Sequence, residues 1–255
     1  MTVRTEYIGD HVSLVEFSQP PHNFFDPEML WEIYEAYRDL GQDGKSRAIV
    51  LGSEGRHFCA GANFRKAAVD SLAPPPTPRP HLYQIAILAM SQPLPVVAAV
   101  QGSAVGGGLG LALSADFRVA TPDARLTANF ARIGFHHGFG LTATLPRAVG
   151  HQKATELLYT GRDVSGTEAL EIGLVDRLAE ADELRGAAIA FAKEIAHCAP
   201  LSLLSVRETM RRPLLEEFRR SVDRELAEQN KLRDTEDFKI GVNTKRGEVP
   251  QFVGR

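Results

Sequence analysis

The distribution of apolar and polar residues predicts a series of strands in the first half of the chain. Residues 11–17 alternate between the two types closely enough for a strand. Residues 48–55 and 95–102 are short apolar runs that end in turn residues, which is typical of buried strands, and residues 115–121 form a weaker run. Several prolines over residues 73–80 lock the backbone and remove hydrogen-bond donors, so we expect a surface loop there.

Helical spacing of apolar residues is found near the N-terminus and dominates the chain from about residue 140 onwards. Residues 26–40 have this spacing, with Asp26 placed to cap the helix and a proline at its first position. A helix is expected within residues 166–178, with its end and a glycine cap at residues 170–173. Two amphipathic helices are expected over residues 183–199 and 213–232. Strands mixed with helices, followed by helices alone, indicate an α/β core with a helical C-terminal part.

Composition argues against several classes of function but does not indicate which function the protein has. The 255 residues are 44 % hydrophobic and 24 % charged, with a net charge of -3, so we expect no nucleic-acid or membrane partner. Cys59 and Cys198 form no disulfide framework, and the N-terminus lacks a secretory signal, which together predict a cytoplasmic protein. The most apolar window, residues 93–115, is interrupted by proline, glutamine and glycine, so no membrane span is expected.

A glycine-rich segment over residues 101–116 is the most informative part of the chain. A buried strand runs into a glycine cluster and a helix follows, an arrangement that can hold phosphate. The dinucleotide pattern Gly-x-Gly-x-x-Gly fails, because a match that starts at Gly106 reaches Leu111 instead of glycine. The phosphate-loop pattern fails because Gly108 stands where lysine is required. Either the N–H groups at the helix start stabilise an oxyanion, or the glycines only allow close packing.

A second loop of small residues, GSEGRHFCAGANF at 52–64, also follows a buried strand. Two such loops could each donate one backbone N–H to the same oxygen atom. This pair, in this order, resembles the crotonase superfamily, also called the enoyl-CoA hydratase/isomerase family. The resemblance continues in LPRAVGHQKATELLYTGRDVSGTEALEIGLVD at 145–176 and in DTEDFKIGVNTKRGEVPQF at 234–252, so it covers nearly the whole chain.

The resemblance implies a fold and an assembly. Members of this family share a spiral of ββα turns followed by a helical trimerisation region. We therefore expect a crotonase-like α/β spiral core over residues 1–195 and a C-terminal helical oligomerisation region over residues 196–255. The expected assembly is a homotrimer or a dimer of trimers.

The resemblance also implies a substrate and the residues that bind it. Family members bind acyl-CoA thioesters and use no cofactor beyond the CoA moiety of the substrate. Two backbone N–H groups polarise the thioester carbonyl, and these match Ala62 and Gly107. The stretches that contact CoA match His22, Asn63, Phe64, Arg65 and Lys245.

The sequence departs from the family at the residues that transfer protons. Hydratases of this family use two glutamates, and the matching positions hold Gly110 and Phe130. Other members carry an aspartate in the turn that matches GFHHGFG, at the position of Gly138. His137 directly precedes that position and is the preferred general acid or base, with His136 as the second candidate. The alternative is a histidine that only packs in the turn. A metal site is not expected, because neighbouring side chains diverge and no third ligand is evident.

Three functions stay open at this point. The protein could be a lyase or isomerase that stabilises a thioester enolate and moves protons, as in double-bond isomerisation. It could direct an activated water at a β-keto thioester and cleave a carbon–carbon bond. It could also be a non-catalytic acyl-CoA-binding protein, which the missing carboxylates would suit.

Overall fold

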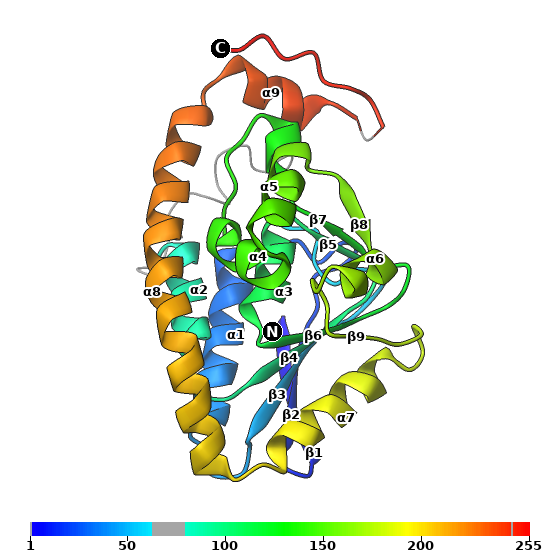
Figure 1. Ribbon diagram of the computed structural model, residues 1–255, viewed down its shortest axis with the longest axis vertical. Coiled ribbons are helices and arrows are strands. Elements are labelled where there is room, and N and C mark those ends of the chain that lie inside the picture. The colour runs from blue at the N-terminus through cyan, green and yellow to red at the C-terminus, as the bar shows by residue number, and fades with distance from the viewer. Residues whose placement is uncertain (1, 63–79, 246) are drawn as a thin grey trace.

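A six-stranded sheet runs through the middle of the molecule (Figure 1). The computed structural model describes residues 2–62, 80–245 and 247–255. The first strand pairs antiparallel with the second, and the others are parallel. In spatial order the strands are β1 (Val3–Gly9), β2 (Val12–Phe17), β3 (Ala48–Ser53), β4 (Val96–Val100), β6 (Phe117–Ala120) and β9 (Arg177–Leu178). The four strands predicted from the sequence are confirmed as β2, β3, β4 and β6.

A smaller sheet contains β5 (Ser103–Val105), β7 (Arg125–Thr127) and β8 (Asp163–Ser165). β4 in the large sheet is followed directly by β5 in the small one and then by a helix. β6 in the large sheet is likewise followed by β7 in the small one. The chain therefore repeats a strand–strand–helix turn, which confirms the predicted mixed α/β spiral.

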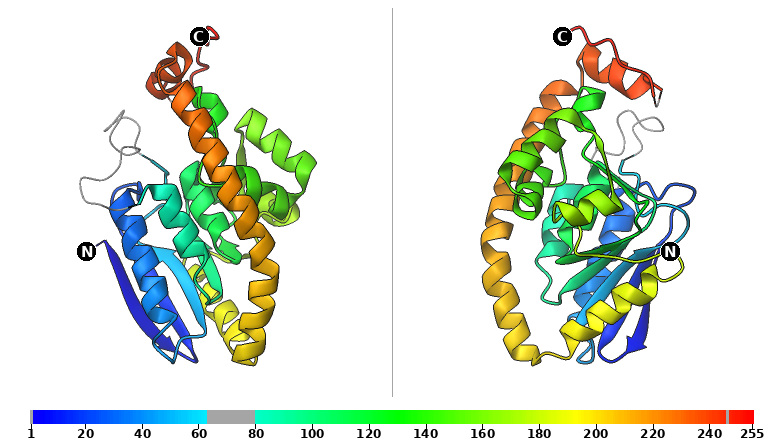
Figure 2. Two further views of the ribbon diagram at one scale, coloured as in Figure 1. Left: turned by 90° about the vertical axis from the view of Figure 1, so that its left-hand side faces the viewer. Right: turned by 45° about the vertical axis from the view of Figure 1, so that its right-hand side comes forward.

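Helices cover both faces of the large sheet (Figures 1 and 2). On one face Val97 and Ala99 of β4 pack against α7, while Ala98 and Val100 face the opposite core with α1, α2 and α3. Both faces are buried, which explains why these strands are continuous apolar runs. The helices are α1 (Pro27–Leu40), α2 (Leu82–Met90), α3 (Gly107–Ser114), α4 (Leu141–Val149), α5 (His151–Thr160), α6 (Gly166–Glu171), α7 (Leu184–Ala196), α8 (Pro200–Leu232) and α9 (Glu236–Asn243), with a short 3₁₀ helix η1 (Phe130–Ile133).

The first predicted helix begins where its cap was expected. Asp26 accepts a hydrogen bond from the Met29 backbone nitrogen at 2.9 Å, and Pro27 occupies the first helical position. This satisfies one of the N–H groups that a helix start leaves without an acceptor.

The second half of the chain differs from the prediction in three places. The helix within residues 166–178 ends at Glu171, inside the predicted helix end at residues 170–173, but the chain then adds β9 to the large sheet, and this strand was not predicted. β8 was not predicted either, because a strand of three residues has no readable period. The last long helix begins at Pro200, and Pro213 lies inside it. A proline at a helix start is common, so the sequence could not separate these two positions.

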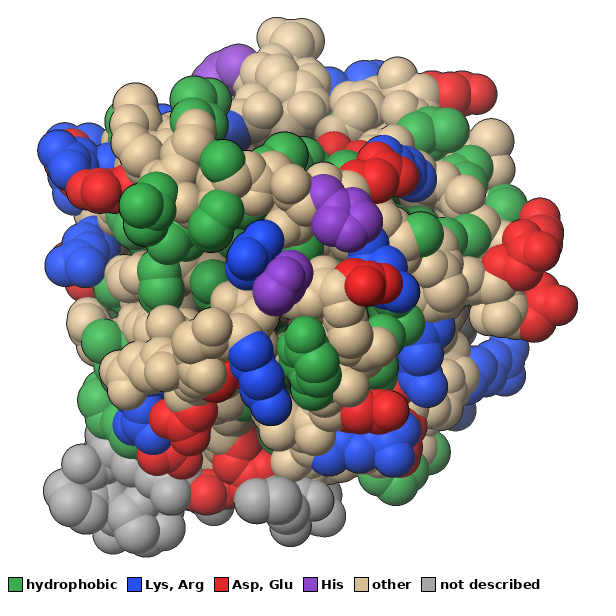
Figure 3. Space-filling view, turned by 90° about the horizontal axis from the view of Figure 1, so that it is seen from below, with side chains coloured by type: hydrophobic (Ala, Val, Ile, Leu, Met, Phe, Trp, Pro, Cys, Tyr) green, Lys and Arg blue, Asp and Glu red, His purple; other side chains and the backbone are tan. Residues whose placement is uncertain are grey.

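The long helix α8 joins the predicted C-terminal region to the core. Phe218 and Val222 are fully buried in the main hydrophobic cluster, and α8 packs against α2 and α4 along one side of the molecule (Figures 1 and 2). The predicted division at residue 195 falls within α7, and it stays a prediction. No single helix in the described ranges is long and apolar enough to cross a membrane; α7 and α8 pass such a test only as a pair, bent by 104°. The lower face of the molecule carries acidic and basic side chains close together (Figure 3).

The turn GFHHGFG is held in place by two buried side chains of α8. Glu225 accepts hydrogen bonds from the Gly140 nitrogen at 2.7 Å and from the Thr142 nitrogen and hydroxyl at 3.0 and 2.6 Å. Gln229 donates to the carbonyls of His136 and His137 at 3.1 and 3.2 Å. The carboxylate of Glu225 therefore caps the start of α4, where the N–H groups and the helix dipole favour a negative charge.

Replacing Glu225 with glutamine should destabilise the protein. The amide would direct one N–H group at a backbone N–H that now donates to the carboxylate, which leaves a buried donor unsatisfied. We expect Glu225→Gln to lower the free energy of unfolding by about 1–3 kcal/mol. The exposed Glu216→Gln on the same helix is the control and should change it by less than about 0.5 kcal/mol. Urea denaturation measures both, and equal effects would contradict the capping role.

Candidate active site

The two glycine-rich loops found in the sequence run side by side in the structure. Cys59 forms a parallel bridge with Ala104. The Cys59 nitrogen donates to the Ser103 carbonyl at 2.9 Å, and the Val105 nitrogen donates to the Cys59 carbonyl at 3.0 Å. The approach is so close that a Cβ atom at Gly108 would overlap the carbonyl of Cys59. Only glycine fits where α3 begins to pass this loop.

This pairing brings the predicted oxyanion donors, Ala62 and Gly107, close together. A Cβ atom at Gly61 would lie 3.5 Å from the Gly107 nitrogen. Gly107 is the first residue of α3, so its N–H has no acceptor within the helix. Among the described residues, no hydrogen bond joins the N–H of Ala62 or Gly107 to a backbone carbonyl in a turn, loop or helix cap. Two backbone N–H groups beside a helix start can hold an oxygen that carries negative charge.

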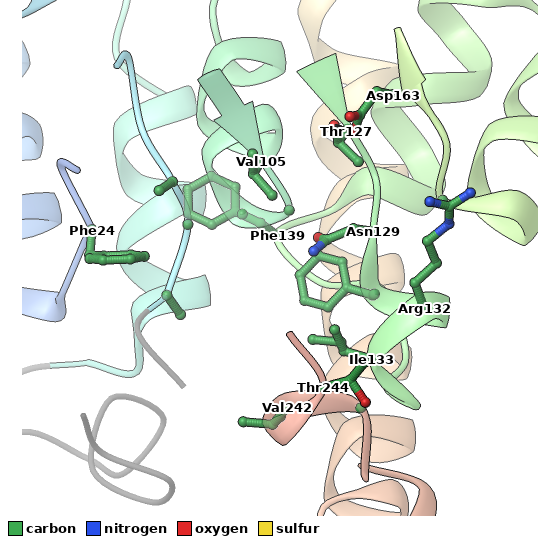
Figure 4. Close-up of a pocket in the computed structure, with 18 of the residues that line it drawn as sticks. Phe24, Val105, Thr127, Asn129, Arg132, Ile133, Phe139, Asp163, Val242 and Thr244 are labelled. Atoms are coloured by element: carbon green, nitrogen blue, oxygen red, sulfur yellow. Dashed lines mark hydrogen bonds between the residues drawn. The ribbon is translucent and has the colours of Figure 1, made fainter. Parts of the chain in front are cut away.

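A pocket of about 490 Å³ opens beside these two residues, and both of them line it. Its size is that of a typical small-molecule site. One part of its wall is apolar and consists of Phe24, Phe25, Leu82, Val105, Phe130, Ile133, Phe139 and Val242. Another part is polar and includes Arg125, Thr127, Asn129, Arg132, Asp163 and Lys245 (Figure 4).

Aromatic rings pack at Gly110 and Phe130, the two positions that the resemblance matches to glutamates. A Cβ atom at Gly110 would lie 2.7 Å from the Cβ of Phe139, so no side chain fits there without moving that residue. The ring of Phe139 lies 5.4 Å from that of Phe25. Phe130, at the second glutamate position, is 6 % exposed and lies against Gly106. The replacement of both carboxylates is thus accompanied by an apolar packing of this part of the wall.

The position of Gly138 is closed in a different way. A Cβ atom there would overlap the Tyr83 hydroxyl and the Gln229 amide. The Tyr83 hydroxyl donates to the Gln229 side-chain oxygen at 2.8 Å. Burial raises the pKa of Tyr83, so the hydroxyl stays protonated near neutral pH. An aspartate at position 138 would displace this buried tyrosine–glutamine pair.

His137, the preferred acid–base residue, is not among the residues that line the pocket. It is 8 % exposed, and its Nε2 lies 2.9 Å from the Leu158 carbonyl. Because a carbonyl can only accept, Nε2 carries the proton. Burial lowers the pKa of His137 to about 4, so the imidazole is neutral near pH 7. The ring packs edge-on against Phe130 at 5.6 Å. This placement favours a packing role over proton transfer.

His136 is also absent from the pocket lining. Its Nδ1 lies 2.9 Å from the His137 carbonyl, and its side chain is half-buried. Cys59 is fully buried, and burial raises the pKa of its thiol to about 12. A thiol that stays protonated in this way serves packing and does not act as a nucleophile.

The predicted CoA-binding residues are only partly covered by the structure. Asn63, Phe64 and Arg65 lie outside the described residues. His22 is exposed, and its carbonyl accepts a hydrogen bond from the Ala60 nitrogen at 3.1 Å. Ala60 lies two residues before the predicted donor Ala62. Lys245 lines the pocket of its own chain, whereas the resemblance implies contact with the CoA of a neighbouring subunit.

The polar wall contains three residues that the sequence did not single out. Thr127 and Asp163 are in register on β7 and β8, and the Thr127 hydroxyl donates to the Asp163 carboxylate at 2.6 Å. Arg125 donates to the same carboxylate oxygen at 3.1 Å. Asp163 lies 36 positions from Thr127 and 38 from Arg125 in the sequence. Only the strand register brings it next to them. In the ranges that the structure describes, no group of three or more metal-binding side chains occurs.

The fold and site define a class: an α/β spiral protein with two backbone donors beside a largely apolar pocket. Comparisons with known proteins identify the family that has this fold. The pattern of the family described as enoyl-CoA hydratase/isomerase matches residues 8–252. A probable enoyl-CoA hydratase of Bacillus subtilis (strain 168) is 32 % identical over 256 residues, 97 % of each chain. The (E)-benzylidenesuccinyl-CoA hydratase of Thauera aromatica is 32 % identical over 211 residues, 79 % of each chain.

A solved structure supports the fold. The enoyl-CoA hydratase/isomerase of Pseudoalteromonas atlantica T6c has a TM-score of 0.85 to this chain at 26 % identity, with 95 % of each chain covered. The chain therefore belongs to the enoyl-CoA hydratase/isomerase family of the crotonase superfamily, which acts on acyl-CoA thioesters.

The placement of His137 predicts how stability depends on pH. The folded protein takes up a proton on this side chain near pH 4, but the unfolded chain does so near pH 6.5. The unfolded state therefore binds more protons between these values, and the free energy of unfolding should fall as the pH drops through this range. At about 1.4 kcal/mol per pKa unit, the loss amounts to about 3 kcal/mol.

His137→Gln keeps a donor for the Leu158 carbonyl and cannot titrate. We expect the variant to lose most of this fall in stability between pH 6.5 and 4, measured by denaturation at a series of pH values. Turnover of any thioester that the native protein converts should stay within about threefold. A loss of turnover of a hundredfold or more, with the fold intact, would instead support the acid–base role predicted from the sequence.

Proposed function

We propose that the protein is an acyl-CoA-processing enzyme that holds the thioester oxygen of its substrate with the backbone N–H groups of Ala62 and Gly107. The observation that carries this proposal is the pairing of the two glycine-rich loops, which places two backbone donors beside one pocket. When electrons move from the acyl group onto the thioester carbonyl, the oxygen becomes an enolate. Fixed donors in an apolar site favour that state over the neutral thioester.

The rest of the pocket suits an acyl thioester. Phe24, Phe25 and Val242 offer apolar contacts, and Lys245 supplies a positive charge on the same pocket wall. A lysine near the pyrophosphate or 3′-phosphate of CoA gains a charge-assisted hydrogen bond. His22 lies on the neighbouring loop and is exposed, so it can contact CoA from the other side.

The reaction that we favour is the reversible addition of water to a 2-enoyl-CoA. The relatives described above are named as hydratases, and both hydration and double-bond isomerisation place negative charge on the thioester oxygen, the first in a β-hydroxy enolate and the second in a dienolate. The two family glutamates are absent, so a different residue must exchange protons with the substrate. The analysis of products by mass spectrometry in deuterated water separates the two reactions, because only hydration adds the mass of water.

A homotrimer, or a dimer of trimers, is part of the same proposal. Val206 and Met210 lie one turn apart on α8 and are 58 % and 72 % exposed, and Leu201 near the start of the helix is 82 % exposed. Apolar side chains at such exposure commonly lie in contacts between subunits. Light scattering coupled to gel filtration gives the number of chains.

A substitution at Gly107 tests the proposed donors. A Cβ atom there would collide with the ring of Phe25, so either the ring or the start of α3 must move. Moving one of two fixed donors costs about 10²–10³-fold in kcat in enzymes that stabilise an oxyanion. We therefore expect Gly107→Ala to lower kcat by about a hundredfold on the best thioester of a panel of enoyl-, dienoyl- and β-ketoacyl-CoA.

The matched control is Gly186→Ala on α7, where a Cβ atom would meet nothing within 4 Å. This variant should keep the native kcat, and circular dichroism of both variants checks that the fold is unchanged. Native turnover in a folded Gly107→Ala variant would contradict the proposed donor. If calorimetry detects no binding of any CoA thioester to the native protein, the proposed function itself is wrong.

A further inference from the structure

The reaction proposed above needs a side chain that exchanges protons with substrate or water. In the described part of the pocket wall, the carboxylates belong to Asp163 and Glu248. Glu248 is exposed in the C-terminal segment and accepts a hydrogen bond from the Lys245 backbone at 3.2 Å. Asp163 lies on β8, in the small sheet that leads into the oxyanion loop. Both carboxylates reach solvent, and the side chain of Asp163 is 50 % exposed. Asp163 is the better placed of the two, because it lies on a strand and is held by side chains that also line the pocket.

Strand register relates Asp163 to Val105, which lies two residues before the proposed donor Gly107. Val105 is the partner of Thr127, and Thr127 is the partner of Asp163. Neighbouring strands lie about 4.8 Å apart, so Thr127 stands one strand away from Val105 and Asp163 two. The Gly106 nitrogen donates to the Thr127 carbonyl at 2.8 Å, which fixes β7 beside the residue that precedes Gly107. The side chains of all three partners line the pocket.

Two neighbours hold the carboxylate in a defined position. The Thr127 hydroxyl donates to Asp163 Oδ1 at 2.6 Å, and Arg125 donates to the same oxygen at 3.1 Å. Thr127 is 2 % exposed, so its hydroxyl is fixed by its surroundings. Figure 4 shows the side chains of Thr127 and Asp163 next to each other on the wall that also carries Asn129.

We propose that Asp163 is the catalytic acid–base residue of this pocket, with Thr127 and Arg125 as positioning residues. This inference rests on the proposed function. Proton transfer is then carried out by a residue of the small sheet. Positions 110 and 130, where the resemblance implies glutamates, hold glycine and phenylalanine and take no part in it.

Each step of the reaction balances with water as the second reactant. The Asp163 carboxylate accepts a proton from water while the water oxygen bonds to Cβ of the enoyl group. The π electrons of the Cα–Cβ bond move to the thioester oxygen, which becomes an enolate held by the N–H groups of Ala62 and Gly107. The enolate then re-forms its carbonyl, and Cα takes the proton from the Asp163 carboxylic acid. Water has been added, and the carboxylate is regenerated.

The test compares Asp163→Asn with Asp123→Asn, both measured with crotonyl-CoA and with the best thioester of the panel. Asparagine keeps an oxygen for the Thr127 hydroxyl but cannot accept a proton. We expect kcat to fall by about 10²–10⁴-fold, with the dissociation constant of acetoacetyl-CoA within about threefold of native. The incorporation of deuterium at Cα should fall in parallel. Asp123 is exposed in the turn before β7, so its substitution should leave both quantities unchanged.

Thr127 supplies an independent measurement if Asp163→Asn does not fold. Thr127→Val keeps the shape of the side chain and removes the hydroxyl, and Thr127→Ser keeps the hydroxyl. We expect Thr127→Val to lower kcat about tenfold and Thr127→Ser to restore it. The acidic limb of the pH profile of kcat should also shift in Thr127→Val, which a purely structural hydrogen bond would not produce.

The outcomes separate this inference from the proposed function. Near-native kcat in a folded Asp163→Asn variant, or an unchanged rate and pH profile in Thr127→Val, would overturn the role of Asp163. If the native protein binds thioesters but neither hydrates them nor exchanges their protons, the acid–base role is wrong and the protein is a binder. If the native protein binds no thioester, the proposed function fails.

Discussion

The structure depends on the close parallel pairing of two loops that follow neighbouring strands of the large sheet. Cys59 and Ala104 form a bridge, and the carbonyl of Cys59 lies where any side chain at position 108 would have to be. Glycine at that position lets α3 begin directly beside the first loop. The pairing fixes the nitrogens of Ala62 and Gly107 near each other. Backbone donors fixed by sheet hydrogen bonds need no reorganisation when charge develops on a bound oxygen.

The chemistry around this fixed pair differs from that of a hydratase with two glutamates. Phe139 packs on Gly110, and Phe130 replaces the second carboxylate, so the wall next to the donors is apolar. A low-polarity wall strengthens the attraction between the N–H groups and an enolate oxygen. The polar part of the pocket lies on the small sheet, where Thr127 contacts Asp163. We therefore propose that the oxyanion donors stay on the two glycine-rich loops while the proton-transferring group lies on another element.

Apolar periodicity predicted much of the fold, and local motifs identified the two glycine-rich loops that pair in the structure. The four buried strands and the cap at Asp26 follow from short-range patterns, which a single sequence contains. The pairing of β7 with β8 depends on contacts between distant segments, so the Thr127–Asp163 hydrogen bond could not be predicted. His137 illustrates the reverse difficulty. Its residue type and its place in a glycine-rich turn indicate proton transfer, but its burial and its contact with the Leu158 carbonyl are visible only in the structure.

The most direct test of the account is a crystal structure of the protein with acetoacetyl-CoA. The account predicts that the thioester oxygen accepts hydrogen bonds from both the Ala62 and Gly107 nitrogens, each at about 2.7–3.1 Å. The acyl group should then lie in the pocket lined by Phe130 and Phe139. A ligand whose thioester oxygen contacts neither nitrogen would contradict the central claim, even if the acyl group occupied the same pocket.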